Sequence, residues 1–118
     1  MPSDPKHIAA SKLSARLFAA LGDETRLRLV SRLCAGGPAS IATLAAGSKL
    51  TRQAISKHLR VMEKAHLIHR TRQGRESVCR LDPQSLETAQ RSLDLISKQW
   101  DGALARLQAF VEKDDSQK

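Results

Sequence analysis

The 118-residue chain has few aromatic side chains, with one tryptophan, two phenylalanines and no tyrosine. Its core must therefore be aliphatic. Two cysteines, Cys34 and Cys79, are too few for a disulfide framework and fit a reducing cytoplasm. No apolar run reaches the roughly 18 residues of a membrane span, and residues 1–7 lack the apolar segment of a signal peptide. We therefore expect one cytoplasmic domain over residues 1–118, with no membrane partner.

Positive charge is abundant, and it is concentrated in one segment. The formal net charge is +8, from 20 lysines and arginines against 12 acidic residues. Between Lys49 and Leu81, nine cations accompany two anions, which gives +7 and leaves +1 for the rest of the chain. Such concentration indicates a surface for a polyanion. The alternative is a basic face that only keeps the protein soluble.

The N-terminal third predicts two helices behind a disordered tail at residues 1–6. Apolar residues recur at helical spacing from His7 to Leu21, and Gly22 ends this pattern. Asp23 is a capping residue for a second helix. The face of this helix that we expect to be buried consists of Leu27, Leu29, Val30, Leu33 and Cys34.

The middle of the chain predicts a helix-turn-helix followed by a β-hairpin. Ser40 caps a short helix, and Thr51 caps a second one that ends near Lys64. The four residues 47–50 between them include a glycine, as such turns do. Strand-like segments at 68–72 and 76–81 flank the turn Gln73-Gly74-Arg75.

A long helix is predicted over residues 83–112, because Asp82-Pro83 is a strong helix start. Its apolar residues alternate at spacings of 3 and 4, which is a heptad seam. The seam consists of Leu86, Ala89, Leu93, Ile96, Trp100, Ala103, Leu107 and Phe110. A helix of this length, on the order of 40 Å, exceeds what the domain's own core needs, so we expect its outer half to pack on a second copy. Trp100 then lies in the dimer core, or alternatively forms one wall of a small-molecule pocket near the dimer axis.

The helix that begins at Thr51 has one polar, basic face and one apolar face. The polar face consists of Arg52, Gln53, Ser56, Lys57 and Arg60, and the apolar face of Ala54, Ile55, His58, Leu59, Met62 and Ala65. A helix of this width fits the major groove of DNA, where glutamine pairs with adenine, arginine with guanine, and serine with either base. We assign Lys57 to phosphate, because a compact ammonium discriminates bases poorly. The alternative for this face is a solvated surface, and His58 is predicted to be a hydrogen-bonded structural histidine.

The hairpin adds further cations. Arg75 at its tip is the best candidate for contact with phosphate or the minor groove. Arg70, Arg72 and Arg80 are predicted to support it electrostatically. A two-fold dimer of this kind would meet an inverted repeat in double-stranded DNA.

Three stretches together resemble the ArsR/SmtB family of winged helix-turn-helix repressors. They are Leu21–Leu29 (LGDETRLRL), Ala54–Met62 (AISKHLRVM) and Gly74-Arg75. The resemblance covers about Ala10 to Phe110 and implies a mainly α fold with a small β-hairpin wing, in the order α-α-α-α-β-β-α. It also implies a homodimer joined through the first and last helices. The family's members repress their own or a nearby operon and are released by an inducer, which this sequence does not identify.

The sequence departs from the metal-sensing members of that family. Where arsenic, cadmium and lead sensors carry Cys-x-Cys, this chain has the ligand-free stretch Ile41–Ala45. The last helix has no histidine, and its Asp94 and Asp101 lack nitrogen partners. We therefore predict a regulator without a metal site or other cofactor.

Two other functions stay open. One is a metal- or thiol-responsive sensor of the same fold, with unusual ligands drawn from His7, His66, His69, Cys34 and Cys79; otherwise both cysteines are buried and structural. The other is a protein-interaction module whose seam binds a different chain. An enzyme is not expected, because no nucleophile–base arrangement or phosphate-binding glycine loop is present.

Overall fold

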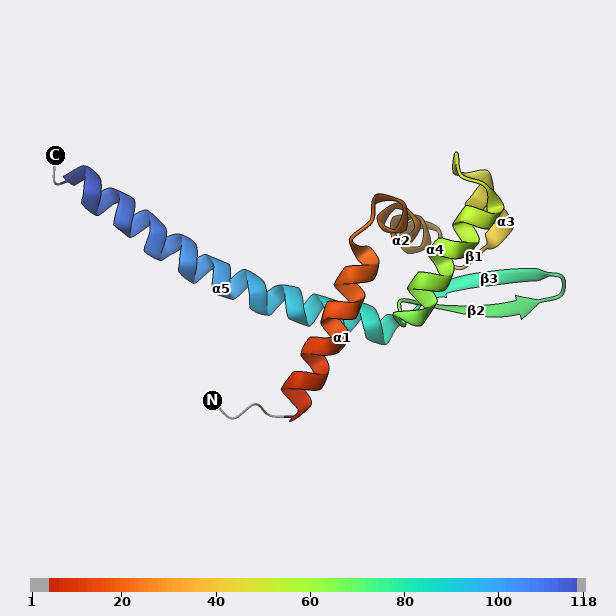
Figure 1. The fold of residues 1–118 in the computed structure, drawn as a ribbon, viewed down its shortest axis with the longest axis horizontal. Coiled ribbons are helices and arrows are strands. Elements are labelled where there is room, and N and C mark those ends of the chain that lie inside the picture. The colour runs from red at the N-terminus through yellow and green to blue at the C-terminus, as the bar shows by residue number, and fades with distance from the viewer. Residues whose placement is uncertain (1–4, 117–118) are drawn as a thin grey trace.

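The computed structural model describes residues 5–116, which form five helices and three short strands. A body made of four helices and the sheet carries a long C-terminal helix that projects away from it, on the side opposite the hairpin (Figure 1). The elements are α1 (Pro5–Leu21), α2 (Glu24–Gly36), β1 (Ala39–Ser40), α3 (Ile41–Ala46), α4 (Arg52–Lys64), β2 (Ile68–Gln73), β3 (Glu76–Leu81) and α5 (Pro83–Ser116).

The predicted order of elements is confirmed, with one strand added. The two residues of β1 pair antiparallel with β3, with Ala39 opposite Cys79 and Ser40 opposite Val78, so the sheet order is β1-β3-β2. A two-residue strand has no periodicity of its own, and only its tertiary partner defines it. The sequence therefore predicted the two strands of the hairpin but not β1.

Two predicted boundaries also change. Helix α1 begins at Pro5, so the last two residues of the expected tail at 1–6 are helical, while residues 1–4 lie outside the described residues. Proline is favoured in the first turn of a helix because its missing N–H has no intrahelical partner there. Helix α5 continues to Ser116, beyond the predicted end at residue 112.

Four predicted capping residues stand at the helix starts. In each case a side-chain oxygen accepts a hydrogen bond from a backbone N–H in the first turn, which satisfies a donor that the helix cannot. The pairs are Asp23 with Arg26, Ser40 with Thr43, Thr51 with Ala54, and Asp82 with Gln84 and Ser85.

The core lies where α4 meets the other helices and the sheet. Ile55, Leu59 and Met62, from the predicted apolar face of α4, are fully buried. The predicted buried face of α2 was wrong for two of its residues, since Leu27 is 51% exposed and Cys34 is also exposed. The buried stripe runs through Leu29 and Leu33, which are one helical turn apart, and the other two side chains point away from that stripe.

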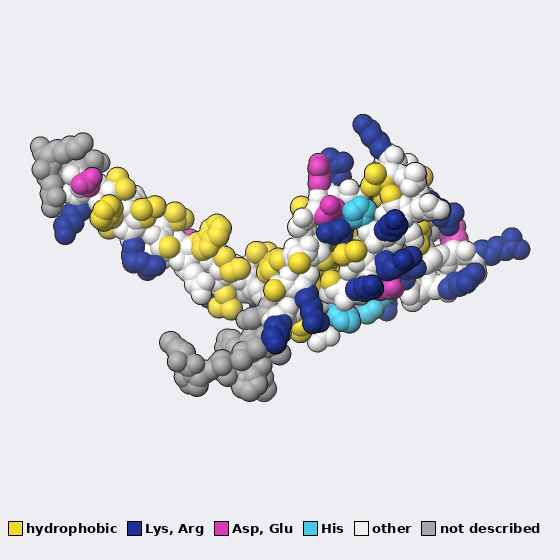
Figure 2. Space-filling view, viewed as in Figure 1, with side chains coloured by type: hydrophobic (Ala, Val, Ile, Leu, Met, Phe, Trp, Pro, Cys, Tyr) yellow, Lys and Arg dark blue, Asp and Glu magenta, His cyan; other side chains and the backbone are white. Residues whose placement is uncertain are grey.

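The apolar seam of α5 lies largely uncovered in the single chain. Ala89 is buried beneath α1, and Ser14 of α1 shares a 2.5 Å hydrogen bond with Ser92. Beyond this crossing, hydrophobic side chains follow one another along α5 (Figure 2). The larger members of the predicted seam there are 36% to 70% exposed: Leu93, Ile96, Trp100, Leu107 and Phe110. Across residues 5–116, none of the helices combines the length and the apolar character needed to cross a membrane.

Candidate nucleic-acid interface

Helix α4 presents the predicted polar face outward. The side chains of Arg52, Gln53, Lys57 and Arg60 are exposed, whereas Ser56 is half-buried. The face is held outward because Ile55, Leu59 and Met62 anchor the opposite side of the same helix in the core. Lysine and arginine side chains gather over the end of the molecule that carries α4 and the hairpin (Figure 2).

The hairpin extends this surface. Strands β2 and β3 pair antiparallel from Ile68 opposite Leu81 to Gln73 opposite Glu76, which leaves Gly74 and Arg75 as the two turn residues. Gly74 has φ 65°, and positive φ at the first turn residue alone is the geometry of a type II′ turn. The turn places the exposed side chain of Arg75 at the tip, as predicted.

The wing's remaining arginines differ in what they can reach. Arg72 and Arg80 are exposed. Arg70 lies opposite Cys79 on the inner face of the sheet, and its Nε is 3.8 Å from Glu63 Oε2 on α4. Its Nη1 is buried and has no hydrogen-bond partner among the described residues. Arg70 therefore packs the wing against α4 and is paired with Glu63, while its electrostatic support of Arg75 stays a prediction.

His58 ties α4 to the start of α2, as the structural interpretation predicted. Its Nδ1 lies 3.3 Å from Arg26 Nη1 and 3.7 Å from Asp23 Oδ2. Arg26 Nε also donates to the carbonyl of Ala20 at 2.5 Å, so one guanidinium connects the end of α1 with α4. The hydrogen bond from the backbone N–H of Arg26 lowers the pKa of Asp23, which keeps that capping carboxylate ionised.

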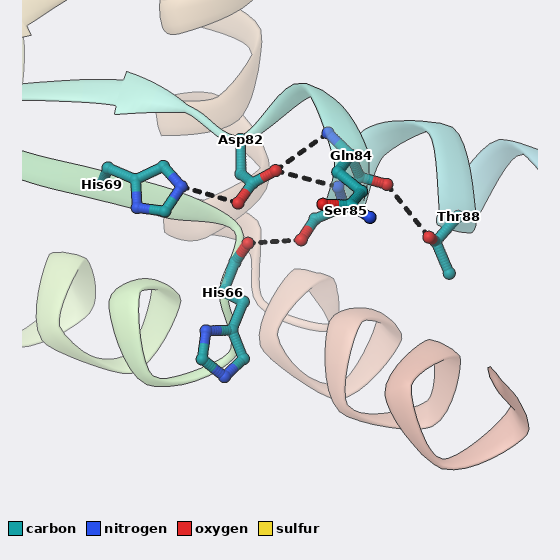
Figure 3. A network of polar contacts seen from close by, with 6 residues as sticks. All are labelled: His66, His69, Asp82, Gln84, Ser85 and Thr88. Atoms are coloured by element: carbon teal, nitrogen blue, oxygen red, sulfur yellow. Dashed lines mark hydrogen bonds and ion pairs between the residues drawn. The ribbon is translucent and has the colours of Figure 1, made fainter. Parts of the chain in front are cut away.

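A second polar network joins the base of the wing to α5 (Figure 3). His69 Nε2 on β2 lies 2.6 Å from Asp82 Oδ2, while Asp82 Oδ1 accepts from the backbone N–H groups of Gln84 at 2.8 Å and Ser85 at 3.1 Å. Ser85 Oγ donates to the carbonyl of His66 at 2.5 Å. The turn after α4, the wing and the projecting helix are thus held together at one point.

This network predicts an acid-sensitive contribution to stability. Burial raises the pKa of Asp82, but hydrogen bonds from Ser85, His69 and Gln84 outweigh it and bring the pKa below its ordinary value of 3.8. The carboxylate therefore stabilises the fold above that value, and the stabilisation is lost as pH falls through the lower pKa of the folded state.

We expect Asp82→Ala to lower the free energy of unfolding by about 1 kcal/mol at pH 7, the usual effect of losing a capping residue. The difference from wild type should shrink below about pH 4. Urea unfolding from pH 7 to 3, at one fixed protomer concentration, measures both. Asp94→Ala, which removes an exposed carboxylate of α5, is the matched control. A difference that is the same at every pH would contradict the assignment.

The alternative ligands predicted from the sequence do not come together as a set. Within the described side chains, no three histidine, cysteine, aspartate or glutamate residues are placed to hold one metal ion, and the side chain of His7 lies outside that part of the chain. Both cysteines were expected to be buried, but Cys34 is exposed at the end of α2. Burial raises the pKa of Cys79, which disfavours a reactive thiolate there.

Arg32 on α2 has a role within the fold that the sequence did not predict. Arg32 donates to the carbonyls of Leu44 and Thr43, at the end of α3. A signal for it was present, because Arg32 follows the buried Leu29 by three residues and so lies beside the apolar stripe of its helix. Charged side chains are almost never buried unless they are paired, so a partner within the protein could be expected there.

Comparisons with known proteins agree with this geometry. Residues 21–71 match a family described as a helix-turn-helix domain. The HTH-type transcriptional regulator Rv2034 of Mycobacterium tuberculosis (strain H37Rv) is 33% identical over 99 residues, which are 84% of this chain and 89% of Rv2034.

Two solved structures extend the comparison. An ArsR-like transcriptional regulator from Rhodococcus sp. RHA1 superposes with a TM-score of 0.69 at 33% identity, over 84% of this chain and 92% of that one. Mb0332 from Mycobacterium bovis, a homodimeric winged helix-turn-helix DNA-binding domain, is similar in fold, with a TM-score of 0.63 at 22% identity over 86% and 91% of the two chains. With its outward basic helix and its wing, the chain belongs to the ArsR family of winged helix-turn-helix transcriptional regulators, which are DNA-binding proteins and not enzymes.

Proposed function

We propose that this regulator is a homodimeric repressor of its own or a nearby operon, that it binds an inverted repeat in double-stranded DNA, and that it does so without a metal ion. The observation that carries the proposal is the outward face of α4, where Arg52, Gln53, Lys57 and Arg60 are exposed together. Such a dimer acts in the compartment that holds the chromosome, the cytoplasm. Bound over a promoter, it would exclude polymerase from the same DNA.

Each side chain has a proposed role in the complex. Gln53 reads adenine in the major groove, while Arg52 and Arg60 contact guanine or phosphate. Ser56 is half-buried, so it reaches only a base or phosphate that approaches α4 closely. Lys57, Arg72 and Arg75 neutralise phosphates, with Arg75 reaching furthest from the body.

The proposed dimer uses α1 and α5. The single chain leaves the seam of α5 largely exposed beyond its crossing with α1, and a soluble protein rarely leaves so continuous an apolar surface in water. The similar Mb0332 domain is homodimeric, which supports the same state here. Two copies of α4 related by a two-fold axis would then enter successive major grooves on one side of the duplex.

Selection of binding sites from a pool of random duplexes tests this function without knowledge of the operon. We expect enrichment of an inverted repeat whose half-site centres are about one helical turn, 10 base pairs, apart. Transcription in vitro from a promoter that contains the selected repeat should fall when the protein is added. Failure to enrich any repeat, or enrichment of a single half-site, would contradict the proposal.

The metal-free assignment rests on the chemistry of the donors. The stretch Ile41–Ala45, which contains no metal-binding side chain, forms most of α3. Asp94 and Asp101 are exposed carboxylates of α5. Metal analysis of the purified protein tests it: a stoichiometric transition metal would favour the sensor alternative.

A further inference from the structure

We propose that Arg32 is a positioning residue for DNA binding, which fixes the turn between α3 and α4 without contacting DNA itself. The proposal rests on the proposed function, because it concerns how the reading face of α4 is presented. By its charge alone, Arg32 could be taken for a DNA contact. The proposal instead gives it a role within the protein.

The guanidinium of Arg32 binds the end of α3. Nη1 donates to the carbonyl of Leu44 at 2.6 Å, and Nη2 donates to the carbonyl of Thr43 at 3.1 Å. Carbonyls in the last turn of a helix lack partners further along the helix, and the partial negative charge there favours a cation. The carbonyl of Thr43 also accepts from the backbone N–H of Gly47 at 3.3 Å, so Arg32 adds a second donor there. Arg32 thus joins α2 to the first helix of the helix-turn-helix at the point where that helix ends.

Gly47 makes room for this contact. Its φ of −88° and ψ of 11° are available to any residue, so the backbone does not demand glycine. A Cβ at this position would lie 2.6 Å from Cζ and 2.9 Å from Nη1 of Arg32, so the guanidinium, the end of a flexible side chain, would have to shift away from its carbonyl partners. Glycine at this position therefore lets the guanidinium of Arg32 keep both of its carbonyl partners.

The position of this pair explains why it matters for reading DNA. Gly47 begins the short turn, and Thr51 caps α4 only four residues later. Ser48 accepts from the backbone N–H of Leu50 within the turn, which leaves little freedom between the two helices. Displacement of the guanidinium would shift the turn, and with it the first turn of α4, where Arg52 and Gln53 lie.

The salt dependence of binding separates positioning from phosphate contact. A lost phosphate contact reduces the slope of log K against log salt concentration by about 1. A lost internal contact lowers affinity but leaves that slope unchanged. Arg32→Lys separates the two roles further. Lysine keeps the positive charge that a phosphate contact needs, but it lacks the planar guanidinium that donates to both carbonyls at once.

The experiment measures affinity for the selected repeat between about 50 and 200 mM salt. We expect Arg32→Lys, Arg32→Ala and Gly47→Ala each to weaken binding about tenfold, the effect of losing one or two hydrogen bonds, with the wild-type slope. Lys57→Ala serves as the phosphate-contact control and should lose about 1 unit of slope. In the Arg32→Ala background, Gly47→Ala should add little, because the clashing group is gone.

Several outcomes would overturn the proposal while leaving the proposed function intact. One is a slope reduced by Arg32→Ala and restored by Arg32→Lys, which would make Arg32 a phosphate contact. A second is unchanged affinity in both Arg32→Lys and Gly47→Ala. A third is a loss of affinity in the Arg32→Ala, Gly47→Ala double variant that equals the sum of the two single losses, because the two residues would then act independently. Circular dichroism confirms that each variant is folded, and Gly47→Ala retains every charge should Arg32→Ala fail to fold. Absence of binding by the wild type would instead contradict the proposed function.

Discussion

Trp100→Glu should convert the protein from a dimer to a monomer and weaken operator binding by at least about 100-fold. Trp100 is 66% exposed in the single chain and lies in the middle of the uncovered seam. In the proposed dimer its ring is buried, where it contributes about 2–3 kcal/mol per subunit. A dimer contains the residue twice, so the dimer dissociation constant should rise on the order of 10³-fold.

The loss of DNA affinity follows from the loss of the dimer. A monomer meets one half-site and has only half of the phosphate and base contacts, so it gains nothing from the second half-site. Sedimentation velocity at several protein concentrations measures the first effect, and a mobility-shift titration with the selected repeat measures the second.

Leu95→Glu is the matched control. Leu95 is 57% exposed on the same helix, but it is not part of the heptad seam, and one residue shifts a side chain by about 100° around a helix. The control should stay dimeric and bind the repeat with nearly wild-type affinity. If Trp100→Glu remained a dimer, the subunits would associate through another surface. A monomeric wild type would instead favour the module whose seam binds a different chain.

Local signals explain why the outward face of α4 and the tip of the wing could be predicted from the sequence. The face of α4 follows from the 3.6-residue period, because apolar residues at Ile55, Leu59 and Met62 fix which side turns outward. The tip of the wing follows from Gly74, since positive φ in a two-residue turn favours glycine. Each signal is contained within a few neighbouring residues.

The parts that could not be predicted depend on contacts between distant segments. Strand β1 exists only because β3 passes beside Ala39 and Ser40. Arg70 turns inward because its register partner is the buried Cys79 and Glu63 lies on the neighbouring helix. The carbonyl partners of Arg32 are likewise on another helix, α3. From the sequence, Gly47 has only the features of a glycine that ends a helix, because the guanidinium beside it comes from a distant segment.

Exposure of the cysteines shows the same limit. Cys34 immediately follows the buried Leu33, and its apolar character favoured burial. The stripe of α2 that meets the core is narrow, however, and the next residue already faces solvent. The width of a buried stripe depends on which elements cover the helix, and those are not encoded within the helix itself.

Gln53→Ala should reduce the preference for the selected operator over random DNA about tenfold, whereas Lys57→Ala should weaken binding to both to the same extent. Gln53 lies in the first turn of α4, exposed, where its amide can donate to and accept from adenine at once. Replacement by alanine removes a contact that only the correct base pair makes. Lys57, one turn further along the exposed face, offers a point charge that any sequence satisfies through its phosphates.

Parallel titrations against the selected repeat and a scrambled duplex, each across a range of salt concentrations, separate the two roles. Gln53→Ala should keep the wild-type salt slope because it removes no charge, and Lys57→Ala should reduce the slope by about 1 on both duplexes. Gln90→Ala, an exposed glutamine of α5, controls for the loss of an amide elsewhere and should change neither quantity. Equal effects of Gln53→Ala on both duplexes would mean that Gln53 touches only the backbone, and specificity would then depend on Arg52, Ser56 and Arg60.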